Sequence, residues 1–154
     1  MKFLMKENRE IIEKIKAQRK KIVFTNGCFD LLHVGHIRYL FEAKQLGDIL
    51  IVGLNSDKSV REIKGQNRPI NSFEDRAILL SALDSVDLVI MFEEQTPENL
   101  IKRIVPDILV KGGDYKIEDI VGHQTVIENG GKVKTLNFHE GYSSTRYANK
   151  INKP

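Results

Sequence analysis

The sequence contains a single cysteine, Cys28, among its 154 residues. An internal disulfide is therefore excluded, and a reducing compartment is compatible with this composition. No apolar run approaches the roughly 18 residues that span a bilayer, and the start of the chain lacks a secretory pattern. The charges are nearly balanced, with 24 basic and 21 acidic residues and a net charge of +3. We therefore expect a cytoplasmic protein that needs neither nucleic acid nor a membrane as a partner.

Apolar runs alternate with amphipathic segments along the chain. Predicted strands cover residues 22–24, 48–54, 86–92, 108–110 and 132–136, and predicted helices cover residues 1–21, 73–83, 96–104, 117–129 and 146–151. This alternation predicts an α/β fold, a doubly wound parallel sheet of about five strands with helices on both faces. One domain is expected over residues 1–154, with an N-terminal helical arm (1–21) and a core (22–151). Because no GxGxxG motif is present, a dinucleotide redox cofactor has no support.

Two histidines lie three residues apart just after the first predicted strand of the core. A helix that begins by His33 places His33 and His36 on one face of its N-terminal end. The unpaired N–H groups there and the helix dipole favour polyphosphate or anionic charge that develops during a reaction. Two alternatives remain at this point, a polar surface pair and a metal site. The other histidines, His123 and His139, stand far away in sequence and beside no ligand cluster.

Two loops are further candidates for ligand binding. The basic stretch 58–71 is predicted to be either a mobile surface loop or a flap over an anion. Paired glycines follow the fourth strand in Lys111-Gly112-Gly113-Asp114-Tyr115, where either a simple turn or the close approach of a ligand explains them. Near the end of the chain, Ser143, Ser144 and Thr145 are predicted to cap a helix.

The segment Gly27-Cys28-Phe29-Asp30-Leu31-Leu32-His33-Val34-Gly35-His36 resembles the GxFDxxHxGH signature of the HxGH nucleotidyltransferase superfamily, which includes cytidylyltransferases and pantetheine-phosphate adenylyltransferase. The resemblance implies a Rossmann-like fold in which the loops after the first and fourth core strands share one crevice. It favours phosphate binding over the two alternatives for the histidine pair.

From about Lys21 to Ile151 the chain is similar to the adenylyltransferase domain of the bacterial heptose enzymes that make ADP-heptose. The similarity lies in Asn55-Ser56-Asp57, Arg68-Pro69-Ile70-Asn71, Phe92-Glu93-Glu94-Gln95-Thr96-Pro97, Leu109-Val110-Lys111-Gly112-Gly113-Asp114-Tyr115 and Leu136-Asn137-Phe138. It implies transfer of AMP from ATP to D-glycero-β-D-manno-heptose 1-phosphate, for the inner core of lipopolysaccharide. A stand-alone form is expected, because the sequence has no sugar-kinase half. The chain departs from many relatives at Ser143-Ser144-Thr145-Arg146, where they have Ser-Thr-Thr and then aliphatic residues.

The resemblance also implies roles for individual residues. The implied catalytic residues are His33, His36, Lys44 and Arg76, although Lys44 also suits a plain surface position. The implied nucleotide-binding residues are Asn26, Gly27, Cys28, Phe29, Asp30, His33, Gly35, His36, Lys111, Gly112, Asp114, Ser143, Ser144 and Thr145. The implied residues for the sugar phosphate are Asn55, Asp57, Lys64, Arg68 and Arg76. Mg²⁺ is expected with ATP, held mainly by phosphate oxygens and water, with no metal site built by the protein itself.

Two other functions are alternatives to this one. A cytidylyltransferase that acts on glycerol 3-phosphate, or on a related alcohol phosphate, shares the HxGH core and differs in the base it selects. A nucleotide-binding module without turnover has no physical need for His33, His36, Asp30 and the Ser143-Ser144-Thr145 segment together. A homodimer or a higher homo-oligomer is expected.

Overall fold

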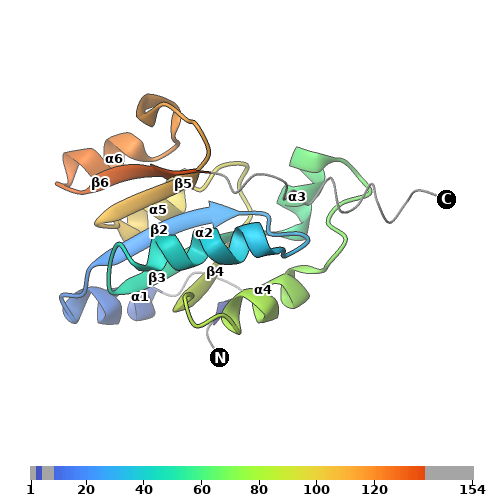
Figure 1. The fold of residues 1–154 in the computed structure, drawn as a ribbon, viewed down its shortest axis with the longest axis horizontal. Helices are drawn as coiled ribbons and strands as arrows, with labels where there is room; N and C mark the ends of the chain where they lie inside the picture. Colours follow the sequence, from blue (N-terminus) through green and yellow to red (C-terminus); the bar gives the residue numbers. More distant parts are fainter. Residues whose placement is uncertain (1–2, 5–8, 138–154) are drawn as a thin grey trace.

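The computed structural model describes residues 3–4 and 9–137 (Figure 1). All six strands in this part of the chain run parallel in one sheet of order β1-β4-β3-β2-β5-β6. The strands are β1 (Phe3–Leu4), β2 (Ile22–Gly27), β3 (Ile49–Asn55), β4 (Leu88–Phe92), β5 (Ile108–Gly112) and β6 (Lys132–Leu136). The helices are α1 (Arg9–Ala17), α2 (Val34–Lys44), α3 (Asp57–Lys64), α4 (Phe73–Ser81), α5 (Glu98–Ile104), the 3-10 turn η1 (Ile117–Asp119) and α6 (His123–Glu128).

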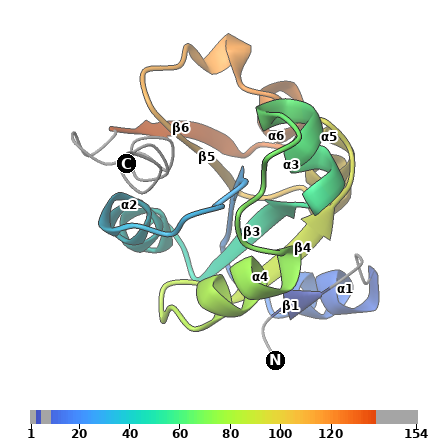
Figure 2. The same ribbon diagram turned by 90° about the vertical axis from the view of Figure 1, so that its right-hand side faces the viewer.

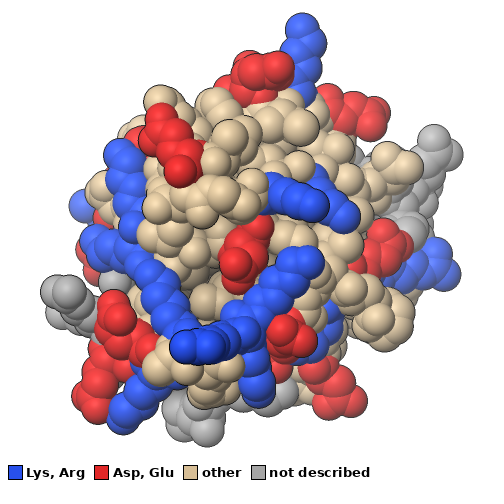
Figure 3. Space-filling model, turned by 90° about the vertical axis from the view of Figure 1, so that its left-hand side faces the viewer, with Lys and Arg blue, Asp and Glu red and all other residues tan. Residues whose placement is uncertain are grey.

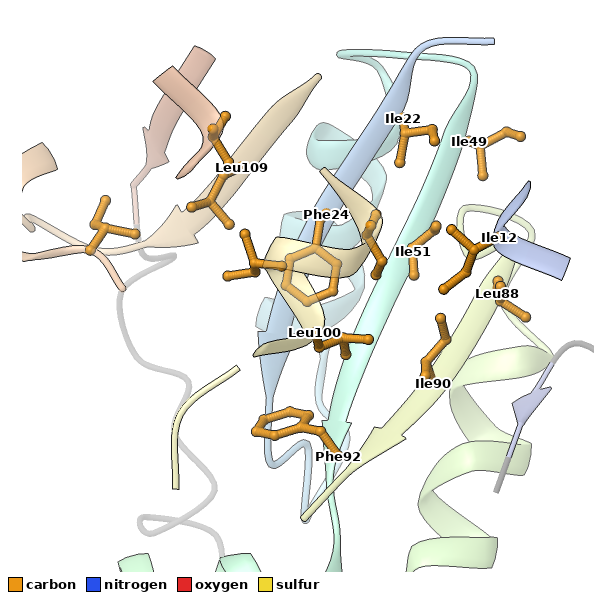
Figure 4. Packing of buried hydrophobic residues seen from close by; sticks show 14 residues of the cluster. Ile12, Ile22, Phe24, Ile49, Ile51, Leu88, Ile90, Phe92, Leu100 and Leu109 are labelled. Carbon is orange, nitrogen blue, oxygen red and sulfur yellow. The ribbon is translucent and has the colours of Figure 1, made fainter. Parts of the chain in front are cut away.

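Helices cover both faces of the sheet, so the central strands are buried on both sides (Figure 2). Alternate residues of each strand point to opposite faces. On one face Phe24 and Ile51 pack against α1, α5 and α6, as the cluster around Leu100 shows (Figure 4). On the other face Val23 and Leu50 pack against α2 and α4. The predicted doubly wound α/β fold is confirmed, and the near-continuous apolar runs of β3 and β4 follow from this two-sided burial.

Aspartates join neighbouring strands at the amino-terminal edge of the sheet. The carboxylate of Asp107 accepts a hydrogen bond of 2.7 Å from the N–H of Ile22, and that of Asp87 accepts one of 2.7 Å from Leu50. Asp48 does the same for the N–H of Lys21 at 2.7 Å. Acidic and basic side chains are interspersed over this end of the molecule (Figure 3). These bonds give acceptors to three backbone N–H groups at this edge of the sheet.

The structure corrects three predicted elements. Residues 3–4 form an edge strand paired with β4, although a helix was expected from residue 1. Residues 57–64 form a helix where a loop was expected. The helix begins there because the side chain of Ser56 caps its N-terminus by accepting the N–H of Ser59. The apolar pattern did not predict it, because Val60 is its only buried apolar residue. The expected helix 117–129 is divided into η1 and α6 around Gly122, whose φ of +86° breaks the helical path.

Candidate active site

The carboxyl-terminal edge of the sheet opens between β2 and β5. These two strands pair only at Val23 with Ile108 and at Phe24 with Leu109, whereas β2 pairs with β3 along its whole length. The crossover from β2 leads through α2 to β3 on one side, while β5 lies on the other side. This is the switch point at which open α/β sheets bind ligands. Figure 2 faces this edge, with the chain leaving β2 towards α2.

The two histidines lie at this edge, at the start of α2. His33 is the N-cap residue, and its Nδ1 accepts a hydrogen bond of 3.3 Å from the backbone N–H of His36. The rings of His33 and His36 stack with centroids 3.7 Å apart and planes 14° apart. Because Nδ1 of His33 is an acceptor, the neutral ring carries its proton on Nε2 and can donate it to a ligand. The predicted common face of the pair is confirmed.

Both imidazoles favour the neutral form. The pKa of His36 is lowered to about 4, mainly by burial and then by the nearby charges of His33 and Lys64, while hydrogen bonding at the backbone of Leu31 opposes this. Burial also lowers the pKa of His33, against the effect of its own backbone. At neutral pH both rings are therefore uncharged, His33 can donate its Nε2–H to an anion, and a bound anion would favour protonation of either ring.

The first turn of α2 supplies further donors. The backbone N–H groups of Val34 and Gly35 have no partner among the residues that the structure describes, whereas that of Ile37 bonds to the carbonyl of His33 at 3.2 Å. Such groups, with the helix dipole, attract phosphate oxygens. Gly35 is thus placed as predicted, in the helical turn between the two histidines.

The turn between β2 and α2 has a constrained backbone. Phe29 has a left-handed φ of +42°, and the edge of its ring lies against the ring of His36 with centroids 5.0 Å apart. A Cβ on Gly27 would come within 2.9 Å of the Phe29 ring, so a side chain there would force that ring to shift. Asn26 and Gly27 end β2 opposite Gly53 and Leu54. The turn therefore fixes one side of the His36 ring by packing.

Asp30, which is fully buried, holds the loop 65–71 over this turn. Its carboxylate accepts the N–H groups of Ile70 at 2.7 Å and Asn71 at 3.1 Å, and it forms an ion pair with Arg68. The side chain of Asn71 donates back to the carbonyl of Asp30 at 2.9 Å. Arg68 is thus engaged by protein through Nε, while its Nη2 is a buried donor without a partner in the described part of the chain. A phosphate oxygen could accept from that nitrogen.

Arg76 connects three segments around the site. It is 1% exposed, and its guanidinium donates to the carbonyl of Cys28 at 2.7 Å, the carbonyl of Asn71 at 3.1 Å and the carboxylate of Asp57 at 2.7 Å. Its implied catalytic and sugar-phosphate roles need a free guanidinium, and the structure instead gives it a supporting role. Asp57, implied to bind the sugar phosphate, is one of its partners and is one-third exposed.

Polar and basic side chains surround Cys28. Its thiol lies 3.8 Å from the Oδ1 of Asn55, whose Nδ2 donates to Ser59 at 2.9 Å, so Asn55 is buried in a structural network and is not free for the sugar phosphate. Burial raises the pKa of Cys28, and the charges of Lys64, Arg76 and Lys111 oppose this. Burial lowers the pKa of Lys111. Lys64 and Lys111 therefore lie close enough to contribute positive charge here.

Lys44 does not lie at this edge. It is the last residue of α2, and its ammonium bonds to Asp87 and to the carbonyl of Asp48, at the amino-terminal edge of the sheet. It lies ten positions after Val34, about 15 Å further along the helix axis. Its implied catalytic role finds no support in this position, because helical geometry carries Lys44 to the far end of α2.

The other implied residues lie at the end of β5 or outside the described part of the chain. Gly112 ends β5 opposite Leu136, and Asp114 is exposed just beyond it. Ser143, Ser144 and Thr145 lie outside the described residues. The sequence reasoning missed two residues that build the site, Asn71 and Ser59. Asn71 belonged to a quoted motif, but nothing in the sequence indicated its contacts with Asp30 and Arg76.

Comparisons with known proteins agree with this geometry. A cytidylyltransferase-like family model matches residues 24–150. Bifunctional protein HldE of Haemophilus ducreyi is 55% identical over 143 residues, which are 93% of this chain and 30% of that protein. The protein of the same name from Geobacter sulfurreducens is 52% identical over 143 residues, 93% of this chain and 29% of that protein. The chain thus spans less than one third of the length of these relatives.

Two solved structures are similar to this one. The lipopolysaccharide core biosynthesis protein from Thermoplasma volcanium GSS1 has a TM-score of 0.64 and 33% identity, over 80% of this chain and 99% of that chain. Pantoate-beta-alanine ligase from Francisella tularensis has a TM-score of 0.65 and 17% identity, over 97% of this chain and 73% of that chain, and shows the fold alone. The predicted superfamily, the Rossmann-like fold and the nucleotidyltransferase class are confirmed.

Proposed function

Because this chain belongs to the cytidylyltransferase-like family, we propose that it transfers AMP from ATP to D-glycero-β-D-manno-heptose 1-phosphate, giving ADP-heptose and pyrophosphate. The observation that carries nucleotidyl transfer is the stacked, neutral pair His33 and His36 at the N-terminus of α2. The choice of ATP and a heptose phosphate follows the resemblance carried by the sequence motifs. A role in lipopolysaccharide synthesis is supported by the similar structure that is named as a lipopolysaccharide core biosynthesis protein. A cytoplasmic location and the homodimer or higher homo-oligomer belong to the same proposal.

In this reaction an oxygen of the sugar phosphate attacks the α-phosphorus of ATP, the bond to the bridging oxygen breaks, and pyrophosphate leaves. The protein contributes positioning and charge stabilisation. His33 Nε2–H and the N–H groups of Val34 and Gly35 suit the phosphate oxygens on which charge increases. Lys64 and Lys111 add positive charge around the same edge. These donors are in place before ligand binds, which reduces the reorganisation needed in the transition state.

The expected Mg²⁺ is assigned to the nucleotide. No group of three or more His, Cys, Asp or Glu side chains in the described residues is arranged to hold a metal ion. We propose that Mg²⁺ enters with ATP, is ligated mainly by phosphate oxygens and water, and neutralises charge on the triphosphate. The described residues also contain no helix that is long and apolar enough to cross a membrane.

Pyrophosphate release tests the proposal. The enzyme with Mg²⁺ should be assayed with ATP and with CTP, each against heptose 1-phosphate and glycerol 3-phosphate. We expect ATP to exceed CTP by at least about tenfold in kcat/KM with the heptose, since a site fitted to one base leaves polar groups unpaired with another. Equal use of CTP, or faster turnover of glycerol 3-phosphate, would favour the cytidylyltransferase alternative. No release with any pair would favour the nucleotide-binding module.

A further inference from the structure

A tyrosine hydroxyl bridges β2 and β5 at the point where the two strands stop pairing. The Tyr39 hydroxyl lies 2.6 Å from Oγ1 of Thr25 and donates to the carbonyl of Val110 at 3.2 Å. Thr25 and Val110 are fully buried. They are the next residues after Phe24 and Leu109, the last paired positions of β2 and β5. The hydroxyl therefore links the two strands just beyond their last paired residues.

The hydroxyl makes a complete local network. Because Tyr39 gives its single proton to Val110, Thr25 is the donor in the shorter bond. Burial raises the pKa of Tyr39, with the Thr25 hydroxyl opposing this, so the hydroxyl keeps its proton at any pH used for assay. Phenylalanine at this position would leave the Val110 carbonyl and the Thr25 hydroxyl unsatisfied in the interior, which is costly.

The same tyrosine stands one helical turn from the histidine pair. His36 and Tyr39 are three residues apart in α2 and so lie on neighbouring positions of one face. Their separation along the axis is about 4.5 Å. On the other side of the bridge, Lys111 directly follows Val110 at the end of β5. One side chain thus joins the helix that carries the histidines to the strand that carries Lys111.

We propose that Tyr39 is a positioning residue, which sets the place of α2 and its two histidines relative to the Lys111 end of β5. It acts through α2 and does not touch substrate. This inference rests on the proposed nucleotidyl transfer, because it assigns the carboxyl-terminal edge between β2 and β5 to the reacting phosphates. A displacement of catalytic groups by about 1 Å can lower a rate by about 100-fold, so a small shift of α2 has a large effect.

The first test is a comparison of three variants in the pyrophosphate assay. Tyr39→Phe removes both bonds, and Thr25→Val removes the Thr25 bond while it keeps the bond to Val110. Ser81→Ala is the matched control, since its buried hydroxyl on α4 has no partner among the described residues. We expect Tyr39→Phe to lower kcat about tenfold or more with a change in KM for ATP of less than about threefold, and Thr25→Val to lower kcat less.

The outcomes separate this inference from the proposed function. Tyr39→Phe with kcat within about twofold of the wild type would overturn the positioning role, as would equal losses in Tyr39→Phe and Thr25→Val, because the Val110 bond would then have no separate effect. If Tyr39→Phe does not fold, Thr25→Val decides: a kcat loss larger than that of Ser81→Ala supports the role, and no such loss overturns it. A wild-type protein without pyrophosphate release would instead count against the proposed function.

A second measurement needs no turnover. In ring-labelled histidine NMR, loss of the Tyr39 hydroxyl should let the start of α2 move outward and expose His36. The pKa of His36 should then rise from about 4 towards the ordinary value of 6.5. Resonances of His123, which lies on α6 and is engaged by the carbonyl of Ile120, serve as the internal reference. An unchanged His36 titration in folded Tyr39→Phe would contradict the inference whatever the substrate is.

Discussion

Acidification should destabilise the protein through His36 before its carboxylates protonate. The pKa of His36 is about 4 in the folded protein and 6.5 in an exposed histidine. Between these values the unfolded chain binds a proton that the folded protein does not bind. The free energy of unfolding therefore rises with pH in this window, and the stability that neutral His36 allows is lost as the pH falls from 6.5 to 4.

The size of the effect follows from the separation of the two pKa values. A difference of about 2.5 units corresponds to about 3 kcal/mol once the titration is complete. Between pH 7 and pH 5 the loss should be about 2 kcal/mol, because most of the unfolded histidines but few of the folded ones are then protonated. Burial also lowers the pKa of His33, so its contribution has the same sign. A loss of this size is a substantial part of a typical domain stability of about 5–15 kcal/mol.

The assay is urea unfolding at pH 7 and pH 5, with wild type and His36→Gln measured in parallel. Glutamine keeps a polar side chain of similar length but does not titrate. The difference in unfolding free energy between the two pH values should shrink by about 1–2 kcal/mol in the variant. If wild type and His36→Gln lose the same stability on acidification, His36 is not the group that resists protonation, and the argument from its burial fails.

Three further predictions concern the supporting contacts. Arg76→Lys keeps the charge but cannot reach three acceptors at once, so urea unfolding should show a loss of about 2–4 kcal/mol; a loss below about 0.5 kcal/mol would contradict the supporting role. Lys44→Met should lower the free energy of unfolding by about 1 kcal/mol and leave kcat within about twofold of the wild type. A tenfold fall in kcat would instead support the catalytic role of Lys44. Asp30→Asn should speed amide exchange at residues 65–71, and unchanged exchange rates would show that Asp30 does not hold this loop.

The fold was predictable to the extent that local pattern decides it. Buried strands such as β3 and β4 are continuous apolar runs, and a capping serine starts α4, so their positions follow from the sequence. The helix α3 was missed because its local signals of capping and charge are not accompanied by an apolar stripe. The strand β1 has two residues and exists only because β4 presents an open edge to it.

Part of the candidate site also follows from local sequence, and part of it depends on contacts between distant segments. The sequence by itself determined the histidine pair, since three-residue spacing at a helix start places both rings on one face whatever surrounds them. It also placed Asp30 and Gly27 in the turn that leads there. It could not determine which charged groups are free, because that depends on partners distant along the chain. The guanidinium of Arg76 donates to the carbonyl of Cys28, 48 residues away in sequence, and the hydroxyl of Tyr39 donates to the carbonyl of Val110, 71 residues away.

Only the tertiary structure therefore decided which candidates face a ligand and which hold the site together. Lys44 and His36 share one helix, yet the length of α2 places them at opposite edges of the sheet. A buried guanidinium must be paired within the protein, and this requirement assigns Arg76 to support. The sequence specified the chemistry at one helix end, whereas long-range packing and the need to satisfy buried polar groups specified its surroundings.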